Sequence, residues 1–316
     1  MEESTVAADD ILNDLKTEFT SLVQRIPKHC IQEFSKVVRD WFETVDGFVD
    51  NNDVYLNSIR EDIRDYEGLP LSAVMATEHV SHPEIGDFAC LEPSNVVHVD
   101  QFLYDDDVID ELCEDGRMSR NYCLECKSHR TKPLTFISHS ASLLMLKYIF
   151  KDVLPDLNGK VLVDVGSRLG PVLYGGYYYS NSSKIVGIEM NEDLCRLQSH
   201  VIEKYHMTER VKVICADVLD KDEILLEADV VVMHNVFEFF ANIEQQIKIW
   251  RFLSKSIRKK GTLIVTIPSI DEMTQSLQMD FDLLSWVEEL PLAHDHHNLD
   301  PDDIDDLERV HLYRVV

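Results

Sequence analysis

The chain has 316 residues, of which 45% are hydrophobic and 28% are charged. These values are those of an ordinary folded domain and disfavour a fibrous or disordered chain. A length above ~250 residues favours a catalytic core with an added module over a single core. Acidic residues outnumber basic ones 58 to 30, so the net charge of −28 repels polyanions at long range. This charge disfavours a broad phosphate-binding surface and therefore nucleic acid as a partner.

Three features of the sequence bear on where the protein works. The first residues, MEESTVAADD, are polar and acidic and do not resemble a secretory signal. No apolar run approaches the ~20 residues that a membrane-spanning helix needs. The seven cysteines are an odd number spread unevenly along the chain, unlike a disulfide framework. We therefore expect no membrane span and a reducing compartment, the cytoplasm or the nucleus.

The first part of the chain, residues 1–137, is predicted to be a mainly helical module. Apolar residues such as Ile11 and Leu15 recur at helical spacing between residues 8 and 66. That period is lost between residues 67 and 137, where Pro, Gly and acidic clusters gather. We expect this module to form part of the substrate cover.

A pair of cysteines near the end of this module has the spacing of half a zinc site. The run CLECKSH contains Cys123, Cys126 and His129 at separations that allow them to bind one zinc ion. Two thiolates need two further ligands, for which His129, Cys113 and His139 are the candidates. Because no second C-x-x-C pair is present, a pair of reduced, packed thiols is the alternative interpretation.

Residues 138–316 are predicted to form an α/β domain. After a predicted helix at residues 140–154, five short apolar runs rich in β-branched residues alternate with longer helical segments. The runs are KVLVDV (160–165), KIVGIE (184–189), VKVICAD (211–217), DVVVMHN (229–235) and TLIVTI (262–267). Such a pattern is typical of a parallel sheet whose two faces are both covered by helices.

Two further strands are predicted at the end of the chain. They follow a predicted helix at residues 271–285 and have the sequences WVEELPL (286–292) and ERVHLYRVV (308–316). The acidic segment 295–308 between them is predicted to be a solvated loop or, alternatively, a surface that binds a basic peptide. The sequence thus predicts seven strands in this domain.

Glycine and acidic residues follow the predicted strands at the edge where open parallel sheets bind ligands. Asp164 and Gly166 end the first strand, and Gly170 precedes a helix. A glycine in this turn lets the backbone approach a ligand closely. Because the turn reads G-S-R-L-G and not G-x-G-x-x-G, it disfavours NAD. Glu189 ends the second strand, where a carboxylate can accept hydrogen bonds from both ribose hydroxyls of an adenosine cofactor.

In their order and spacing, these motifs resemble class I S-adenosylmethionine-dependent methyltransferases, whose first motif is written D-x-G-x-G-x-G. Asp164, Gly166 and Gly170 match that motif, whereas Arg168 replaces its middle glycine. The resemblance covers residues 138–316. It implies a seven-stranded, mostly parallel Rossmann-like sheet closed by an antiparallel C-terminal hairpin, with S-adenosylmethionine as the cofactor.

The resemblance also implies roles for the residues at the strand ends. Glu189 would bind the ribose hydroxyls, and Asp217 would bind the adenine amino group. His234 and Asn235 would lie at the lip that faces the transferred methyl group, where His234 is a candidate general base. The residues expected to bind the cofactor are Asp164, Gly166, Ser167, Arg168, Gly170, Glu189, Met190, Asp217 and Val218.

The expected activity is methyl transfer from S-adenosylmethionine to a protein, a peptide or a small molecule. The acidic charge favours encounter with cationic partners, and the fourth-strand sequence HNVF lacks the N-P-P-Y type tetrad of enzymes that methylate planar amide or base nitrogens. Arg168 motivates a second hypothesis, a methyltransferase-like scaffold that has lost the transfer activity. A third hypothesis is an NAD-linked oxidoreductase.

Overall fold

The computed structural model describes residues 25–27, 51–66, 95–123, 131–275, 277–279, 283–292, 299 and 301–316. Residues Asn52–Val316 form one compact unit, and Met1–Asn51 form a second unit. The helical pattern around Ile11 and Leu15 lies outside the described residues, as do Cys126 and His129. The predictions that depend on those residues stay predictions.

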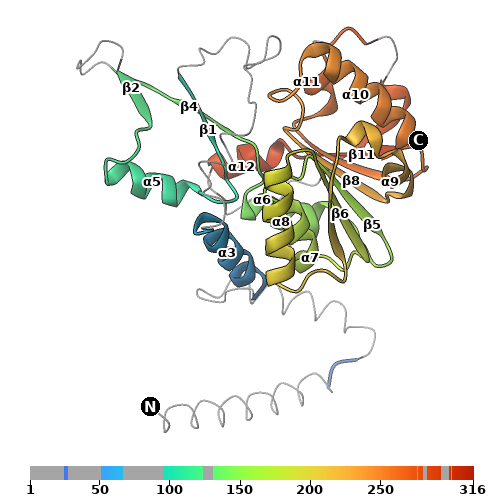
Figure 1. Cartoon of the computed structure of the whole chain (residues 1–316), viewed down its shortest axis with the longest axis horizontal. Helices are drawn as coiled ribbons and strands as arrows, with labels where there is room; N and C mark the ends of the chain where they lie inside the picture. Colours follow the sequence, from blue (N-terminus) through green and yellow to red (C-terminus); the bar gives the residue numbers. More distant parts are fainter. Residues whose placement is uncertain are drawn as a thin grey trace. The chain divides into compact units, whose positions relative to one another are not determined.

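A seven-stranded sheet with the order β10-β11-β9-β8-β5-β6-β7 forms the centre of the larger unit (Figure 1). The strands are β5 (Val161–Val165), β6 (Lys184–Glu189), β7 (Val211–Cys215), β8 (Val230–His234), β9 (Leu263–Ile267), β10 (Val287–Leu290) and β11 (His311–Val315). Strands β5 to β9 run parallel, and β11 runs antiparallel to both of its neighbours, β9 and β10. This sheet confirms the predicted fold class.

Helices cover both faces of the sheet because alternate residues of its buried strands point to opposite sides. Leu162 and Val232 pack in one apolar cluster, and Val163 and Val231 pack in the other. The first cluster includes α6 (Leu143–Tyr148), which continues as a π-helical turn (Ile149–Val153), α7 (Pro171–Tyr179) and α8 (Glu192–Lys204). The second includes α9 (Asp222–Glu227), α10 (Ile243–Ser256) and α11 (Ile270–Thr274). The result is a three-layer α/β fold.

The helices that flank the first two strands start close to the carboxyl ends of those strands. Gly170 has a φ of 88°, and Pro171 follows it at the first helical position of α7. The Asn191 side chain accepts hydrogen bonds from the Asp193 and Leu194 amides and so caps α8. Because α7 and α8 begin at these positions, the β5–α7 and β6–α8 turns lie at the same edge of the sheet.

The described part of the segment before the sheet contains both helices and strands. Its helices are α3 (Asn51–Arg64) and α5 (Asp106–Glu114). Strand β1 (Val96–Val99) pairs in parallel with β4 (Thr135–Ser138), and β2 (Asn121–Cys123) pairs antiparallel with β3 (Thr131–Pro133). The sequence pattern did not predict these short strands. The predicted domain boundary between residues 137 and 138 falls inside β4 and stays a prediction.

Two local predictions near the end of the chain differ from the structure. The segment 295–308 is predicted to be a loop, but helix α12 (Pro301–Glu308) occupies its second half. Ile304 and Leu307 lie on one face of that helix because they are three residues apart, and Leu307 is buried. The helix predicted over residues 271–285 consists of α11 and a separate 3-10 turn (Leu283–Ser285). Among the described helices, none combines the length and the apolarity needed to cross a membrane.

Candidate functional site

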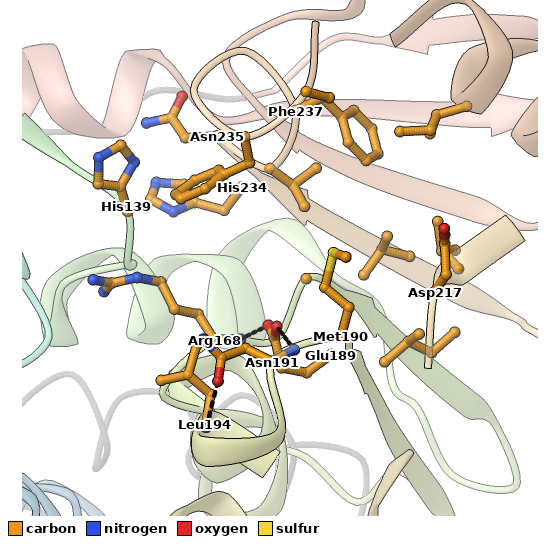
Figure 2. Close-up of a pocket in the computed structure, with 18 of the residues that line it drawn as sticks. His139, Arg168, Glu189, Met190, Asn191, Leu194, Asp217, His234, Asn235 and Phe237 are labelled. Atoms are coloured by element: carbon orange, nitrogen blue, oxygen red, sulfur yellow. Dashed lines mark hydrogen bonds between the residues drawn. The ribbon is translucent and has the colours of Figure 1, made fainter. Parts of the chain in front are cut away.

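A pocket of about 330 Å³ lies at the carboxyl ends of β5, β6, β7 and β8. Its volume is within the range of small-molecule sites, and this edge is where open α/β sheets bind ligands. Part of its lining is shown in Figure 2. Of the eleven residues expected to bind the cofactor or to act in catalysis, eight line it: Gly166, Arg168, Glu189, Met190, Asp217, Val218, His234 and Asn235.

The other three selected residues, Asp164, Ser167 and Gly170, do not line the pocket and instead shape the turn beneath it. The Ser167 hydroxyl donates to Gln198 Oε1 at 2.8 Å, and Gln198 Nε2 donates to the Arg168 carbonyl oxygen at 2.6 Å. Gly170 begins α7 in the left-handed conformation. These contacts hold the loop after β5 against α8.

Asp164 is a buried carboxyl group in the middle of the sheet. Burial, together with the charge of nearby Glu189, raises its pKa to about 8. The side chain is therefore mostly protonated and uncharged at pH 7. Its position in β5 makes it a structural neighbour of the pocket and not part of the lining.

Gly166 occupies a position in the pocket wall where no larger residue fits. Its φ is 73°, and a Cβ atom there would lie 2.2 Å from Val236 Cγ2. Val236 belongs to the turn after β8 and lines the same pocket. The close approach of the two turns therefore requires glycine at this position, whereas the close approach of a ligand to Gly166 stays a prediction.

Glu189 and Asp217 place two carboxylates along this edge. Glu189 Oε2 accepts a hydrogen bond from the Arg168 amide at 2.9 Å, and Oε1 accepts one from the Asn191 amide at 2.8 Å (Figure 2). Asp217 accepts a hydrogen bond from the Leu219 amide at 2.9 Å and so also caps a 3-10 turn. Both side chains are oriented by backbone donors while they line the pocket.

Arg168 has a left-handed backbone conformation of the kind that favours glycine. Its φ is 47°, which costs a non-glycine residue about 1 kcal/mol. The buried guanidinium forms an ion pair with Asp100 and donates to Ser140 Oγ at 3.1 Å, and the Ser140 hydroxyl donates to Asp100 Oδ2 at 2.7 Å. In Figure 2 the Arg168 side chain extends toward His139 and away from Met190. The long side chain therefore extends away from the part of the pocket lined by Glu189 and Met190.

His139 lies at the other end of the pocket, close to His98 of β1. His139 Nε2 and His98 Nδ1 share a hydrogen bond of 2.8 Å. The edges of Phe239 and Phe240 contact the His139 ring, with centroid distances of 5.0 and 5.2 Å. Burial is the main cause that lowers the pKa of His139 to about 2, and the charge of Arg168 adds to it. His139 is therefore uncharged at pH 7.

His234 and Asn235, at the end of β8, lie beside His139 in Figure 2. Burial lowers the pKa of His234 to about 3, with the charge of Arg309 as a second cause. Asn235 has a φ of 44°, and its Nδ2 donates to the Ser138 carbonyl oxygen at 2.8 Å. Its left-handed backbone is a strained conformation of the kind that gathers at functional sites.

Three buried polar atoms at this end have no hydrogen-bond partner among the described residues. They are His139 Nδ1, His234 Nδ1 and Asn235 Oδ1. Buried polar atoms are nearly always paired in folded proteins, and these three belong to residues that line the pocket, which makes them candidates to contact a ligand there.

The structure bears on one of the predicted zinc ligands, His139, and leaves the others as predictions. His139, a candidate zinc ligand by sequence, pairs with His98 in the pocket instead. In the described part of the chain, no group of three or more His, Cys, Asp or Glu side chains could hold a metal ion. Zinc at Cys123, Cys126 and His129 stays a prediction, because Cys126 and His129 lie outside the described residues.

The sheet topology decides the fold family. Numbered from β5 as strand 1, the order across the sheet is 3-2-1-4-5-7-6, and the seventh strand, β11, is antiparallel to both neighbours. The chain has the class I methyltransferase fold. The closing hairpin that distinguishes this fold from nicotinamide-binding sheets is formed by β10 and β11.

Solved methyltransferase structures are similar to this chain over about half of its length. An RNA methyltransferase from Salinibacter ruber in complex with S-adenosyl-L-homocysteine is 18% identical, with a TM-score of 0.33 over 50% of this chain and 82% of that one. An O-methyltransferase from Bacillus cereus is 16% identical, with a TM-score of 0.39 over 56% of this chain and 83% of that one. No protein-family model matches the chain, and no curated protein matches its sequence. With identities below 20% and TM-scores below 0.4, these likenesses do not identify the activity or the substrate of this chain.

Proposed function

We propose that this chain transfers the methyl group of S-adenosylmethionine to a protein, a peptide or a small molecule. One observation carries the proposal: the pocket at the carboxyl ends of β5 to β8 combines a glycine that has no room for a Cβ with two backbone-oriented carboxylates. This is the combination that an adenosine cofactor requires at the edge of an open α/β sheet.

The residues at this end of the pocket fit S-adenosylmethionine in shape and in chemistry. Glu189 would accept the hydrogen bonds of the ribose hydroxyls, and Asp217 would accept that of the adenine amino group. Apolar side chains of Ile188, Leu194 and Val218 line the wall near these acids and would flank the adenine ring. Bound there, the cofactor supplies a methyl group on a positively charged sulfur.

The contribution of the protein to such a transfer is mainly alignment. The wall around the acceptor end is formed by His139, His234, Asn235 and Phe240, which would orient the acceptor and exclude water. An acceptor atom that carries a proton also requires a base.

The charge of the chain supports a protein, a peptide or a small molecule as the acceptor. A net charge of −28 favours encounter with cationic partners and opposes encounter with RNA or DNA. The thiols of Cys113, Cys195 and Cys215 are free, as expected for a protein of the cytoplasm or the nucleus.

Calorimetric titration of the purified full chain tests the cofactor assignment. We expect S-adenosylmethionine and S-adenosylhomocysteine to bind and NAD not to bind. Binding of NAD alone would overturn the assignment and favour an oxidoreductase.

A transfer assay separates an active enzyme from an inactive scaffold. Cell extract incubated with the protein and radiolabelled S-adenosylmethionine should contain a labelled species that resists nuclease. Label in nuclease-sensitive material would refute the charge argument. Firm cofactor binding without label in any extract would favour the scaffold hypothesis, although the Arg168 side chain that motivates it extends away from the cofactor end.

A further inference from the structure

The hydrogen bond between His98 and His139 leaves one nitrogen of His139 for a ligand. Nε2 is engaged by His98 at 2.8 Å, and Nδ1 has no partner among the described residues. His139 is only 5% exposed and lines the pocket. When Nε2 carries the proton and donates it to His98, Nδ1 carries a lone pair that no described residue engages, on a side chain that lines this end of the pocket.

Among the described residues that line this end of the pocket, none is a carboxylate that could pair with a cationic acceptor. Among the described lining residues, Glu189 and Asp217 are the acids, and both belong to the strand ends that would hold the cofactor. Arg168 also lines the pocket, and its own partner Asp100 is almost fully buried. A protonated amine here would lie near the Arg168 guanidinium, and the amine would have no counter-charge of its own. Such an unpaired charge is unfavourable in a buried site.

We propose, on the basis of the methyl transfer proposed above, that His139 is the catalytic base and that the acceptor is an uncharged N–H or O–H group. The acceptor atom forms a bond to the methyl carbon, and the sulfur–carbon bond breaks with its electron pair staying on sulfur. The acceptor proton moves to His139 Nδ1 while the Nε2 proton moves to His98 Nδ1. The positive charge that leaves the sulfur therefore ends on His98.

His98 is needed because the surroundings of His139 disfavour a positively charged imidazole ring. Burial and the nearby Arg168 guanidinium disfavour the imidazolium form of His139. His98 is half-buried, so it keeps more contact with water and can carry the proton at lower cost. His234 has no comparable route, because its hydrogen-bond partner is the backbone of His139, which does not take up a proton.

NMR of the full chain with 15N-labelled histidine side chains tests this arrangement without an acceptor. Two-bond 1H–15N correlations report which ring nitrogen carries the proton, and His139→Gln assigns the signal. We expect His139 at pH 7 to be neutral with its proton on Nε2, and the signal to change in His98→Asn. A proton on Nδ1, or an imidazolium at pH 7, would overturn the proposal.

The labelled-transfer assay tests the role of the base in turnover. His139→Gln should lower turnover by about 10²–10⁴-fold, the usual contribution of a general base, with unchanged affinity for S-adenosylhomocysteine. Added imidazole should restore part of the activity of His139→Gly, which a purely structural histidine would not allow. His98→Gln should cause a smaller loss and shift the pH profile, whereas the exposed His200→Gln serves as the control and should match the wild type.

The results of these two experiments distinguish a failure of the proposed base from a failure of the proposed methyl transfer. Turnover of His139→Gln close to that of the wild type would reject His139 as the base while the methyl transfer stands. Absence of label with the wild type would count against the methyl transfer itself, and the tautomer seen by NMR would still decide the state of His139.

Discussion

Removal of one partner from the buried ion pair between Asp100 and Arg168 is predicted to be strongly destabilising. Both side chains are buried, with exposures of 1% and 8%, and Asp100 also accepts hydrogen bonds from the Ser140 hydroxyl and the Leu103 amide. Asp100→Asn keeps the shape but leaves the guanidinium without its counter-charge. Removal of one partner from a buried pair costs about 3–5 kcal/mol.

Thermal unfolding followed by circular dichroism measures this loss. A domain of this size loses about 2–4 °C of melting temperature per kcal/mol, so Asp100→Asn should melt roughly 10 °C below the wild type. Glu288→Gln provides a matched control, because the Glu288–Arg314 pair is exposed and such pairs contribute below about 1 kcal/mol. The double variant Asp100→Asn with Arg168→Met should recover part of the loss, since it buries no unpaired charge. Equal melting temperatures for Asp100→Asn and Glu288→Gln would refute the reasoning.

Three further predictions concern the pocket. Glu189→Ala should weaken S-adenosylhomocysteine binding by at least ~1.5 kcal/mol in calorimetry, because it removes a charge-assisted contact, whereas the exposed Glu192→Ala should not. Gly166→Ala should abolish that binding because its Cβ clashes with Val236, and Val236→Ala in the same chain should restore part of it. Burial lowers the folded-state pKa of His139 to about 2, against about 6.5 when unfolded, so acid protonates the unfolded state first. Stability from this residue is present above pH 6.5 and lost as pH falls, so the urea midpoint should drop from pH 7 to pH 5, and less in His139→Gln.

The sheet and the convergence of Gly166, Glu189 and Asp217 on one pocket were predictable from local sequence. The strands of a doubly covered sheet are continuous apolar runs, and their carboxyl ends meet at one edge. Gly166, Glu189 and Asp217 follow such runs directly, so their convergence required no knowledge of distant contacts. Helix α12 was not predicted because its sequence is mostly acidic and contains only two apolar residues, Ile304 and Leu307, on one face.

The sequence also indicated His234 and Asn235, but the pairing of His98 with His139 was not predictable in the same way. His98 and His139 are 41 residues apart, on either side of a segment without a clear period, and the strands that align them have four residues each. Asp100 and Arg168 are 68 residues apart. Spacing along the chain carries no information about such pairs, and His139 therefore appeared only as a possible metal ligand.

The parallel pairing of β1 with β4 divides the pocket between two stretches of the chain. Glu189 and Asp217 follow strands of the large sheet, whereas His98 and His139 come from the small one. A fragment that begins at residue 138 would contain all seven strands of the large sheet and none of β1. Changes in the short strands can therefore alter the surroundings of His98 and His139 while the strands that carry Glu189 and Asp217 stay unchanged.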